Sequence, residues 1–575
     1  MVPRTLRSLL VFLAFLFCAA SLFAAGFDAV RAQHVMVTSV HPLASSAGAQ
    51  IMREGGNAVD AAVATGFALA VVHPSAGNLG GGGFMLYRTA VGEVHFLDFR
   101  EMAPAAATRD MYLDQQGKAT AQSRFGYRAS GVPGSVAGLV EAERRWGKLG
   151  LAKVIEPAIR LARDGVPVTQ YEAASMHDKE LARDPESRRI FQRDGRYYQQ
   201  GELLRQPELA ATLERIQKNP DDFYHGALAQ EIAAAIQRGG GLITAADLAH
   251  YKVVERTPIH GTYRGYDVYS APPPSAGGVA LIETLNILEG FDLRAARRNS
   301  AAHLHLVAEA YRRAFFDRTV FLGDPDFVPV PVAQLTDKKY AERWRATIDP
   351  AHASDSSKLE RPSFAELDQS AALHTPYIGP EKTDTTHYSV VDEAGDAVSV
   401  TTTLNDAYGS RVTLPGFGFL LNDEMDDFAA KPGSPNMYGL VQGETNAIAP
   451  AKRPLSTMTP TIVAKDGKLL LVLGSPGGPT IITTVADVLI NVVDFGEDIQ
   501  RAVNAPRFHH QWMPDELRVE AWQLSPDTLD LLEKMGHRLK PTGSWGDAEC
   551  IAIESATGER LGASDARNGG AAVGW

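Results

Sequence analysis

Two short stretches late in the chain have the pattern of hydrophobic and polar residues that is typical of β-strands. Thr385–Asp392 and Ala397–Leu404 are rich in threonine and valine, and a short polar break containing glycine separates them. This arrangement predicts a β-hairpin. If its turn contains three or four residues, Thr403 lies opposite Thr385 or its neighbour Thr386. The pattern therefore predicts that two threonine side chains come together.

The remainder of the chain reads as helices mixed with short strands. Apolar residues at helical spacing predict helices over Asn57–Val72, Val154–Arg163, Leu228–Arg238, Val279–Leu288, Ala301–Arg318 and Ile481–Val493. Short runs of β-forming residues predict strands over Phe84–Arg88, Val94–Phe99, Tyr266–Ser270 and Leu469–Leu473. This mixture predicts an α/β protein.

A long polar segment lies directly before the hairpin. Residues Pro325–Asp384 are rich in Asp, Ser, Pro and Lys, and only Lys338–Ile348 has a helical pattern. A loop of this length inside a compact protein is either functional or removed by processing. The segment ends at the bond between Asp384 and Thr385.

The first residues have the pattern of an export signal. Arg4 and Arg7 precede the apolar run Leu9–Ala25, and Val30-Arg31-Ala32 offers a cleavage site of small residues. We expect a signal peptide over residues 1–32 and a periplasmic or secreted protein. Because the apolar run is slightly long for a signal core, an uncleaved membrane anchor is the alternative.

Composition narrows the classes of protein. The 575 residues are 45% hydrophobic and carry a net charge of −12, which favours a globular chain and argues against nucleic-acid binding. If the leader is removed, Cys550 is the only cysteine, so no internal disulfide forms. No later apolar run has the length of a membrane-spanning helix.

Sequence signatures of cofactor, metal and serine-elbow chemistry are missing. The glycine run Gly80–Gly83 has neither a Walker ending nor the GxGxxG spacing, so we interpret it as close backbone packing. There is no GxSxG, HExxH or CxxC motif, and His509-His510 has no further ligands at metal spacing. We therefore expect no metal and no cofactor, and two buried, hydrogen-bonded histidines.

A threonine nucleophile would fit the remaining pattern. A threonine hydroxyl needs a base, and a free α-amino group on the same residue can act as one because its pKa lies near neutrality. Thr385 would acquire that amino group only after cleavage of the Asp384–Thr385 bond. By itself, a Thr-Thr pair in a strand indicates no more than β-propensity.

Longer motifs favour a nucleophilic threonine over a simple strand pattern, because nearly the whole chain after the leader resembles the bacterial γ-glutamyltransferases. The matching stretches are Gly55–Ala62 (GGNAVDAA), Asp98–Pro104 (DFREMAP), Gly131–Gly138 (GVPGSVAG), Thr385–Asp392 (TTHYSVVD), Leu421–Phe428 (LNDEMDDF), Lys452–Pro460 (KRPLSTMTP), Gly474–Gly478 (GSPGG) and Asn504–Trp512 (NAPRFHHQW). The resemblance implies the four-layer αββα sandwich of N-terminal-nucleophile hydrolases. It also implies self-cleavage into a large chain, residues 33–384, and a small chain, residues 385–575, which form a heterodimer and one structural unit.

The resemblance assigns the reacting groups. Thr385 matches the nucleophile of the family, and its α-amino group would act as the general base. Thr403 matches the second threonine that hydrogen-bonds the nucleophile. Gly477 and Gly478 match the oxyanion hole, whose backbone N–H groups stabilise charge in the transition state.

The resemblance also implies a pocket for the charged end of a γ-glutamyl group. Arg100 matches the arginine that binds the α-carboxylate, assisted by the hydroxyls of Ser456 and Thr457. The residues matching the acceptors for the α-ammonium are Asn405, Glu424 and Asp427. The stretch Pro432–Gly443 resembles the lid of some bacterial members, with Tyr438 as its gate.

Some positions depart from the family pattern. Glu424 stands where many relatives carry glutamine, Thr457 where many carry serine, and Pro479-Thr480 where Ser-Arg is common. The implied reaction transfers the γ-glutamyl group of glutathione or a similar donor to water, or to an amino acid or peptide. The alternatives are a cephalosporin or glutaryl acylase, which resembles this family, and an exported binding protein with a silent site.

Overall fold

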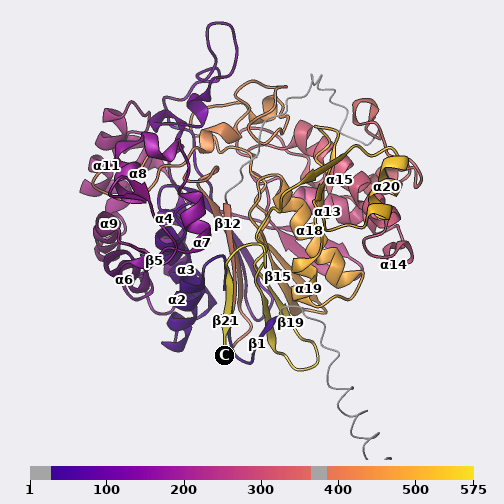
Figure 1. The fold of residues 1–575 in the computed structure, drawn as a ribbon, viewed down its shortest axis with the longest axis horizontal. Coiled ribbons are helices and arrows are strands. Elements are labelled where there is room, and N and C mark those ends of the chain that lie inside the picture. The colour runs from indigo at the N-terminus through magenta and orange to yellow at the C-terminus, as the bar shows by residue number, and fades with distance from the viewer. Residues whose placement is uncertain (1–27, 364–384) are drawn as a thin grey trace, which may run out of the picture.

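The computed structural model describes residues 28–363 and 385–575. Two seven-stranded sheets pack face to face in the centre of the molecule, and a layer of helices covers the outer face of each sheet (Figure 1). Neighbouring strands in both large sheets are antiparallel. The predicted four-layer αββα sandwich is confirmed.

Each large sheet contains strands from both sides of residue 384. The first sheet has the order β21 (Ala571–Gly574), β2 (Met36–Ser39), β12 (Thr385–Val391), β13 (Ala397–Thr403), β3 (Gly82–Arg88), β4 (Val94–Phe99) and β9 (Val254–Arg256). The second has the order β1 (Val30–Ala32), β20 (Arg560–Ala563), β19 (Cys550–Ile553), β15 (Lys468–Leu473), β14 (Thr461–Lys465), β11 (Tyr266–Ser270) and β10 (Ile259–Tyr263). The two predicted chains therefore share one fold.

Helices from separate parts of the chain form the two outer layers. The helices on the first sheet are mainly α2 (Pro42–Arg53), α3 (Ala58–Val72), α4 (Ser135–Trp146), α6 (Glu156–Asp164), α9 (Pro207–Lys218) and α11 (Ala227–Arg238). Those on the second are mainly α13 (Gly277–Leu288), α15 (Ala301–Phe321), α17 (Lys338–Arg345), α18 (Thr480–Val493), α19 (Ile499–Asn504) and α20 (Pro526–Lys534). The two layers flank the strands in Figure 1.

Shorter elements complete the fold. The short helices are α5 (Leu151–Val154), α7 (Gln170–Ser175), α8 (Pro185–Phe191), α10 (Asp222–His225), α12 (Ala245–His250), α14 (Leu293–Ala296) and α16 (Val332–Leu335). A three-stranded sheet contains β16 (Phe508–His509), β17 (Leu517–Glu520) and β18 (Leu539–Thr542). Two small antiparallel pairs are β5 (Val166–Pro167) with β8 (Leu203–Leu204), and β6 (Gln192–Arg193) with β7 (Arg196–Tyr197).

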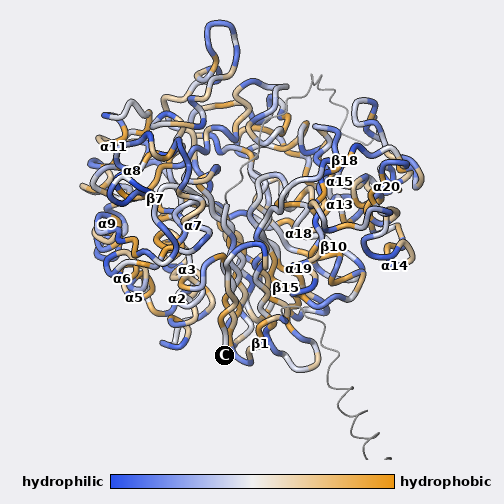
Figure 2. Tube along the Cα trace, in the orientation of Figure 1, coloured by the Kyte–Doolittle hydropathy of each residue, from blue (hydrophilic) through white to orange (hydrophobic). Residues whose placement is uncertain are grey.

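The core follows the hydrophobic pattern of the sequence. Figure 2 shows hydrophobic residues along the central strands and hydrophilic residues on many outer loops. Helix α3 is buried along its whole length, and the side chain of Asn57 caps it in a reciprocal pair with Asp60. Phe84, Phe96 and Val472 belong to the apolar layer between the two sheets. Burial on both faces fixes the central strands, including the one that begins at Thr385.

Two details differ from the predictions. The predicted helix Val154–Arg163 is divided, because α5 ends at Val154 and α6 begins at Glu156 with Pro157 in its first turn, where a missing N–H is tolerated. The polar segment that begins at Pro325 also contains α16, in addition to the expected helix near residue 338. Its last part, residues 364–384, lies outside the described residues.

Most of the predicted leader, residues 1–27, also lies outside the described part. Val30–Ala32 forms β1, and Arg31 pairs with Glu554 and Glu559. The predicted boundary after Ala32 would therefore remove an edge strand, and the cleavage remains a prediction. Among the described residues, no helix is both long and apolar enough to cross a membrane.

Candidate active site

The β12–β13 hairpin brings the two predicted threonines together. The register pairs Thr385 with Thr403, which is one of the two pairings expected from the turn length. Their hydroxyl oxygens lie 3.1 Å apart, and only 7% of Thr385 is exposed. The hydroxyl of Thr403 accepts a hydrogen bond of 2.8 Å from the backbone N–H of Asn405. This contact fixes the rotamer of Thr403, which can then donate its proton to Thr385.

The glycine run Gly80–Gly83 makes room for this hairpin. Gly82, the first residue of the neighbouring strand β3, pairs directly with Thr403 of β13. A Cβ atom on Gly81 would lie 2.0 Å from the carbonyl oxygen of Thr403, and one on Gly83 would lie 2.4 Å from that of Thr401. Any larger residue would push β13 away from the site. The prediction of close backbone packing is confirmed.

A tight turn between β15 and α18 supplies backbone donors beside the threonines. Gly477 has a φ of 137°, which favours glycine, and a side chain there would collide with Thr480. Within residues 28–363 and 385–575, no hydrogen bond uses the N–H of Gly477 or Gly478. The hydroxyl of Thr457 donates to the carbonyl of Gly478 at 2.7 Å and holds the turn. Two amide donors at the N-terminal end of α18 suit a developing negative charge.

A buried charged group lies on one side of Thr385. Arg100 follows β4 and directs its two terminal nitrogens to Glu424 and Asp427. Arg100 and Glu424 have side chains only 1% exposed, and Asp427 is 14% exposed. Burial raises the pKa of Glu424 well above its usual range, although Arg100 opposes the shift, and burial raises the pKa of Glu101 to about 7. The structure therefore brings the predicted carboxylate-binding arginine into direct contact with two predicted ammonium-binding acids.

The predicted lid residue Tyr438 lines this cavity. The hydroxyl of Tyr438 donates to the side-chain oxygen of Asn405 at 2.7 Å, and the amide of Gln511 donates to the carbonyl of Tyr438 at 3.2 Å. Tyr438 is 4% exposed and packs with Leu440 in an apolar cluster against α15 and α18. Tyr438 is thus a buried part of the cavity lining, in contact with one of its predicted polar residues.

One cavity contains almost all of the predicted site. Its lining includes Arg100, Thr385, Thr403, Asn405, Glu424, Asp427, Tyr438, Ser456, Thr457 and Gly478. Asp384 lies outside the described residues. The lining residues that the sequence analysis did not identify as site residues are Arg318, Leu440, Leu455, Met458 and Ile481. Their common signal is proximity to motifs already recognised, except for Arg318, which lies inside an ordinary helical pattern.

A second, larger cavity opens on the other side of Thr385. Its lining includes Thr385, Gly477 and Thr480, residues of the C-terminal region such as Lys540, and residues of the first half of the chain such as Tyr171. The nucleophile candidate therefore stands between a small charged cavity and a wider one. This arrangement suits a substrate that carries a small charged group on one side of the bond to be broken and a larger group on the other side.

The adjacent histidines are structural. His509 hydrogen-bonds Thr483 and Gln511, and His510 hydrogen-bonds Asp515 and the backbone of Trp512. Both histidines are 1% exposed, and burial lowers the pKa of His510 to about 4. The interpretation of His509-His510 as packed and hydrogen-bonded is confirmed.

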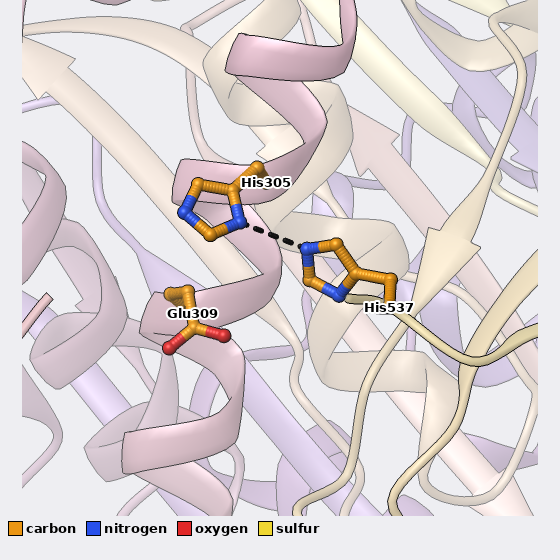
Figure 3. Close-up of side chains that lie close together, drawn as sticks. All are labelled: His305, Glu309 and His537. Carbon is orange, nitrogen blue, oxygen red and sulfur yellow. Dashed lines mark hydrogen bonds between the residues drawn. The ribbon is translucent and has the colours of Figure 1, made fainter. Parts of the chain in front are cut away.

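Another cluster with ligand-type side chains consists of two residues of α15 and His537, which follows α20. Figure 3 shows His305 and Glu309 near His537, and a dashed line joins the two imidazole rings. The nitrogens of this hydrogen bond are 2.8 Å apart. His305 Nε2 donates to the carbonyl of Asp349, so His305 Nδ1 accepts from His537. The carboxylate of Glu309 accepts hydrogen bonds from Arg312, from Arg313 and from the hydroxyl of Ser354. Because these atoms already have protein partners, the cluster is a hydrogen-bonded support.

The fold and the site define the class of protein. A threonine at the start of a central strand, with a second hydroxyl and two backbone donors beside it, in an αββα sandwich, is the arrangement of N-terminal-nucleophile hydrolases. The family model described as Gamma-glutamyltranspeptidase matches residues 44–575. The chain belongs to the gamma-glutamyltranspeptidase family.

Individual relatives agree with this family. The chain is 50% identical over 547 residues to the glutathione hydrolase proenzyme of Escherichia coli K12, covering 94% of this chain and 92% of the relative. Its fold matches the crystal structure of cephalosporin acylase from Bacillus halodurans with a TM-score of 0.81, at 28% identity and over 97% and 98% of the two chains. It also matches γ-glutamyltranspeptidase from Helicobacter pylori with a TM-score of 0.57, at 42% identity over 61% of this chain and 99% of that chain.

Proposed function

We propose that this protein is a γ-glutamyltransferase that moves the γ-glutamyl group of glutathione, or of a related amide, to water or to an amine. The observation that carries the proposal is the position of Thr385. Its hydroxyl lies 3.1 Å from that of Thr403, at the border of a cavity that holds Arg100, Glu424 and Asp427. A nucleophile beside paired charges of both signs suits a donor with an α-carboxylate and an α-ammonium.

Maturation begins at the same hydroxyl. The Oγ1 atom of Thr385 attacks the carbonyl carbon of Asp384, and the peptide bond is replaced by an ester while the nitrogen of Thr385 gains a proton. Water then hydrolyses the ester and leaves a free α-amino group on Thr385. The products are the large chain, residues 33–384, and the small chain, residues 385–575. Both large sheets contain strands of both chains, which supports a stable heterodimer.

In the mature enzyme the new amino group acts as the base. It takes the proton from Oγ1 as this oxygen attacks the γ-carbonyl of the donor. The N–H groups of Gly477 and Gly478 hold the oxyanion, and the leaving amine receives the proton as the C–N bond breaks. Water or an acceptor amine then attacks the ester and releases Thr385. The wider cavity beside Gly477 gives the leaving and attacking amines room.

The charged cavity explains how the donor is selected. Arg100 is paired with Glu424 and Asp427, so the buried cation and the acids compensate each other in the described structure. A zwitterionic donor can insert between them, with its carboxylate on Arg100 and Ser456 and its ammonium on the acids and Asn405. This exchange keeps each buried charge opposite a partner of the other sign. A donor with only one of its two charges would leave a buried group unpaired.

Export is also part of this proposal. The charged and apolar pattern of residues 1–32 supports a signal peptide and a periplasmic or secreted enzyme. Among residues 28–363 and 385–575, no helix is suited to a membrane span. Glutathione and amino-acid or peptide acceptors would then be met outside the cytoplasm.

A comparison of donors tests the function. We expect the cleaved protein to turn over γ-glutamyl p-nitroanilide about 100-fold faster, in kcat/KM, than glutaryl p-nitroanilide, which lacks the ammonium. Glycylglycine should raise the release of nitroaniline if amines resolve the ester. A preference for the glutaryl compound would identify a glutaryl acylase. No turnover of either compound by fully cleaved protein would identify a silent binding protein.

Replacement of Thr403 by valine tests the second hydroxyl. We expect Thr403→Val to keep the fold, because valine has nearly the same shape and suits β13. The variant loses the contact to Thr385 and leaves the N–H of Asn405 without its acceptor. We expect kcat to fall by about 10- to 100-fold, as for the loss of one positioning hydrogen bond. An unchanged kcat in cleaved Thr403→Val enzyme would remove Thr403 from the mechanism.

A further inference from the structure

Arg318 lies in the last turn of α15 and lines the charged cavity together with Arg100, Asp427 and Ser456. Only 1% of Arg318 is exposed. Helix α15 belongs to the layer on the second sheet, whereas Arg100 follows a strand of the first sheet. The cavity is therefore bordered by two arginines that come from different layers of the sandwich.

Arg318 differs from the other fully buried arginines. Arg100, Arg312, Arg313 and Arg507 each have a carboxylate within ion-pair distance. Within the described residues, Arg318 has no ion pair, and its Nε and Nη1 atoms are buried without a hydrogen-bond partner. A buried guanidinium without a partner is unfavourable, so a folded chain rarely keeps one unless an anion binds there.

The charge of Arg318 is retained at neutral pH. Burial lowers the pKa of Arg318 to about 10, and the negative charge of Asp427 opposes this shift through space. Arg100, in contrast, has both terminal nitrogens directed to Glu424 and Asp427. Arg318 is thus the cation of this cavity whose donors are not already used by the acids.

Resting on the function proposed above, we propose that Arg318 binds the α-carboxylate of the γ-glutamyl donor, opposite Arg100 and beside the hydroxyl of Ser456. The carboxylate offers two oxygens, which can accept from two arginines at once. Arg318 is then a substrate-binding residue that gives this protein a second cation for the carboxylate. It also explains why an arginine is buried at the end of a helix that otherwise carries apolar and paired residues.

Three donors distinguish binding of the carboxylate from other roles. We would measure kcat/KM for γ-glutamyl p-nitroanilide, for glutaryl p-nitroanilide, and for 4-aminobutanoyl p-nitroanilide, which keeps the ammonium and lacks the carboxylate. For Arg318→Gln we expect a loss of about 100-fold with the first two donors and a loss below about threefold with the third. Enzyme concentration is raised until each donor gives a measurable rate. Arg318→Lys should recover part of the loss with the first two donors.

Arg312→Gln is the matched control. Arg312 is buried on the same helix but pairs with Glu309 and Asp515 outside the cavity, so its replacement should affect all three donors by the same factor. Equal losses for Arg318→Gln with all three donors would overturn the proposal and assign Arg318 a packing role. A loss confined to the two donors with an ammonium would also overturn it and assign Arg318 to the positioning of Asp427. Absence of γ-glutamyl turnover by the parent enzyme would contradict the proposed function itself.

Discussion

The Thr385→Ala variant is expected to accumulate as one chain, whereas the parent protein separates on a denaturing gel into two chains divided before residue 385. Alanine has no hydroxyl to attack the carbonyl of Asp384, so residue 385 can no longer form the ester intermediate of self-cleavage. We expect the turnover of γ-glutamyl p-nitroanilide to fall below detection, because both the nucleophile and its free amino group are absent. Gel electrophoresis, N-terminal sequencing of the small chain and an anilide assay measure these outcomes.

Thr385→Ser is the control for this experiment. Serine keeps an oxygen nucleophile and fits the buried start of β12, so the variant should still divide at the same bond and keep measurable activity. Division of Thr385→Ala before residue 385 would show that an external protease makes the cut. Activity in an undivided Thr385→Ala chain would show that another residue is the nucleophile.

The local parts of this site could be predicted from the sequence. The contact of Thr385 with Thr403 follows from strand periodicity and from a short turn, since these fix the register of a hairpin. The glycine run beside β13 was also interpretable, because only glycine tolerates the approach of Gly81 to the carbonyl of Thr403. In both cases the decisive interactions lie within one element or between neighbouring strands.

The long-range parts could not be predicted. Arg100 and Glu424 are 324 positions apart, and their contact depends on how the loop after β4 meets the turn Glu424–Asp427. The family motifs indicated that these residues share a pocket, but not that the arginine and the acids pair with each other. Arg318 had no signal, because a paired and an unpaired arginine on a helix look the same in sequence. Only the three-dimensional structure shows that Arg318 lines the cavity and that its Nε and Nη1 atoms have no hydrogen-bond partner in the described part of the chain.

Arg100→Ala is expected to mature normally and to lose most of its activity toward γ-glutamyl donors. Self-cleavage acts on the Asp384–Thr385 bond and does not require a free amino acid in the charged cavity. The variant removes the cation that faces Glu424 and Asp427, and with it the charge-assisted contact that we propose to the donor carboxylate. Loss of such a contact in a buried site costs about 2–5 kcal/mol. In kcat/KM this corresponds to roughly a 30-fold to several-thousandfold decrease.

Arg100→Lys is the informative partner of this variant. Lysine restores a positive charge but not the planar fork that reaches two carboxylates, so we expect only partial recovery of kcat/KM. Burial already raises the pKa of Glu424, so this acid can accept a proton when the arginine is removed, which favours a folded and cleaved Arg100→Ala protein. Gel analysis of maturation and the ratio of γ-glutamyl to 4-aminobutanoyl p-nitroanilide turnover are measured on the same samples, because the second donor lacks the carboxylate. A matured Arg100→Ala enzyme that handles γ-glutamyl p-nitroanilide as well as the parent does would contradict the role of Arg100 in donor recognition, because the buried ion pairs would then be purely structural.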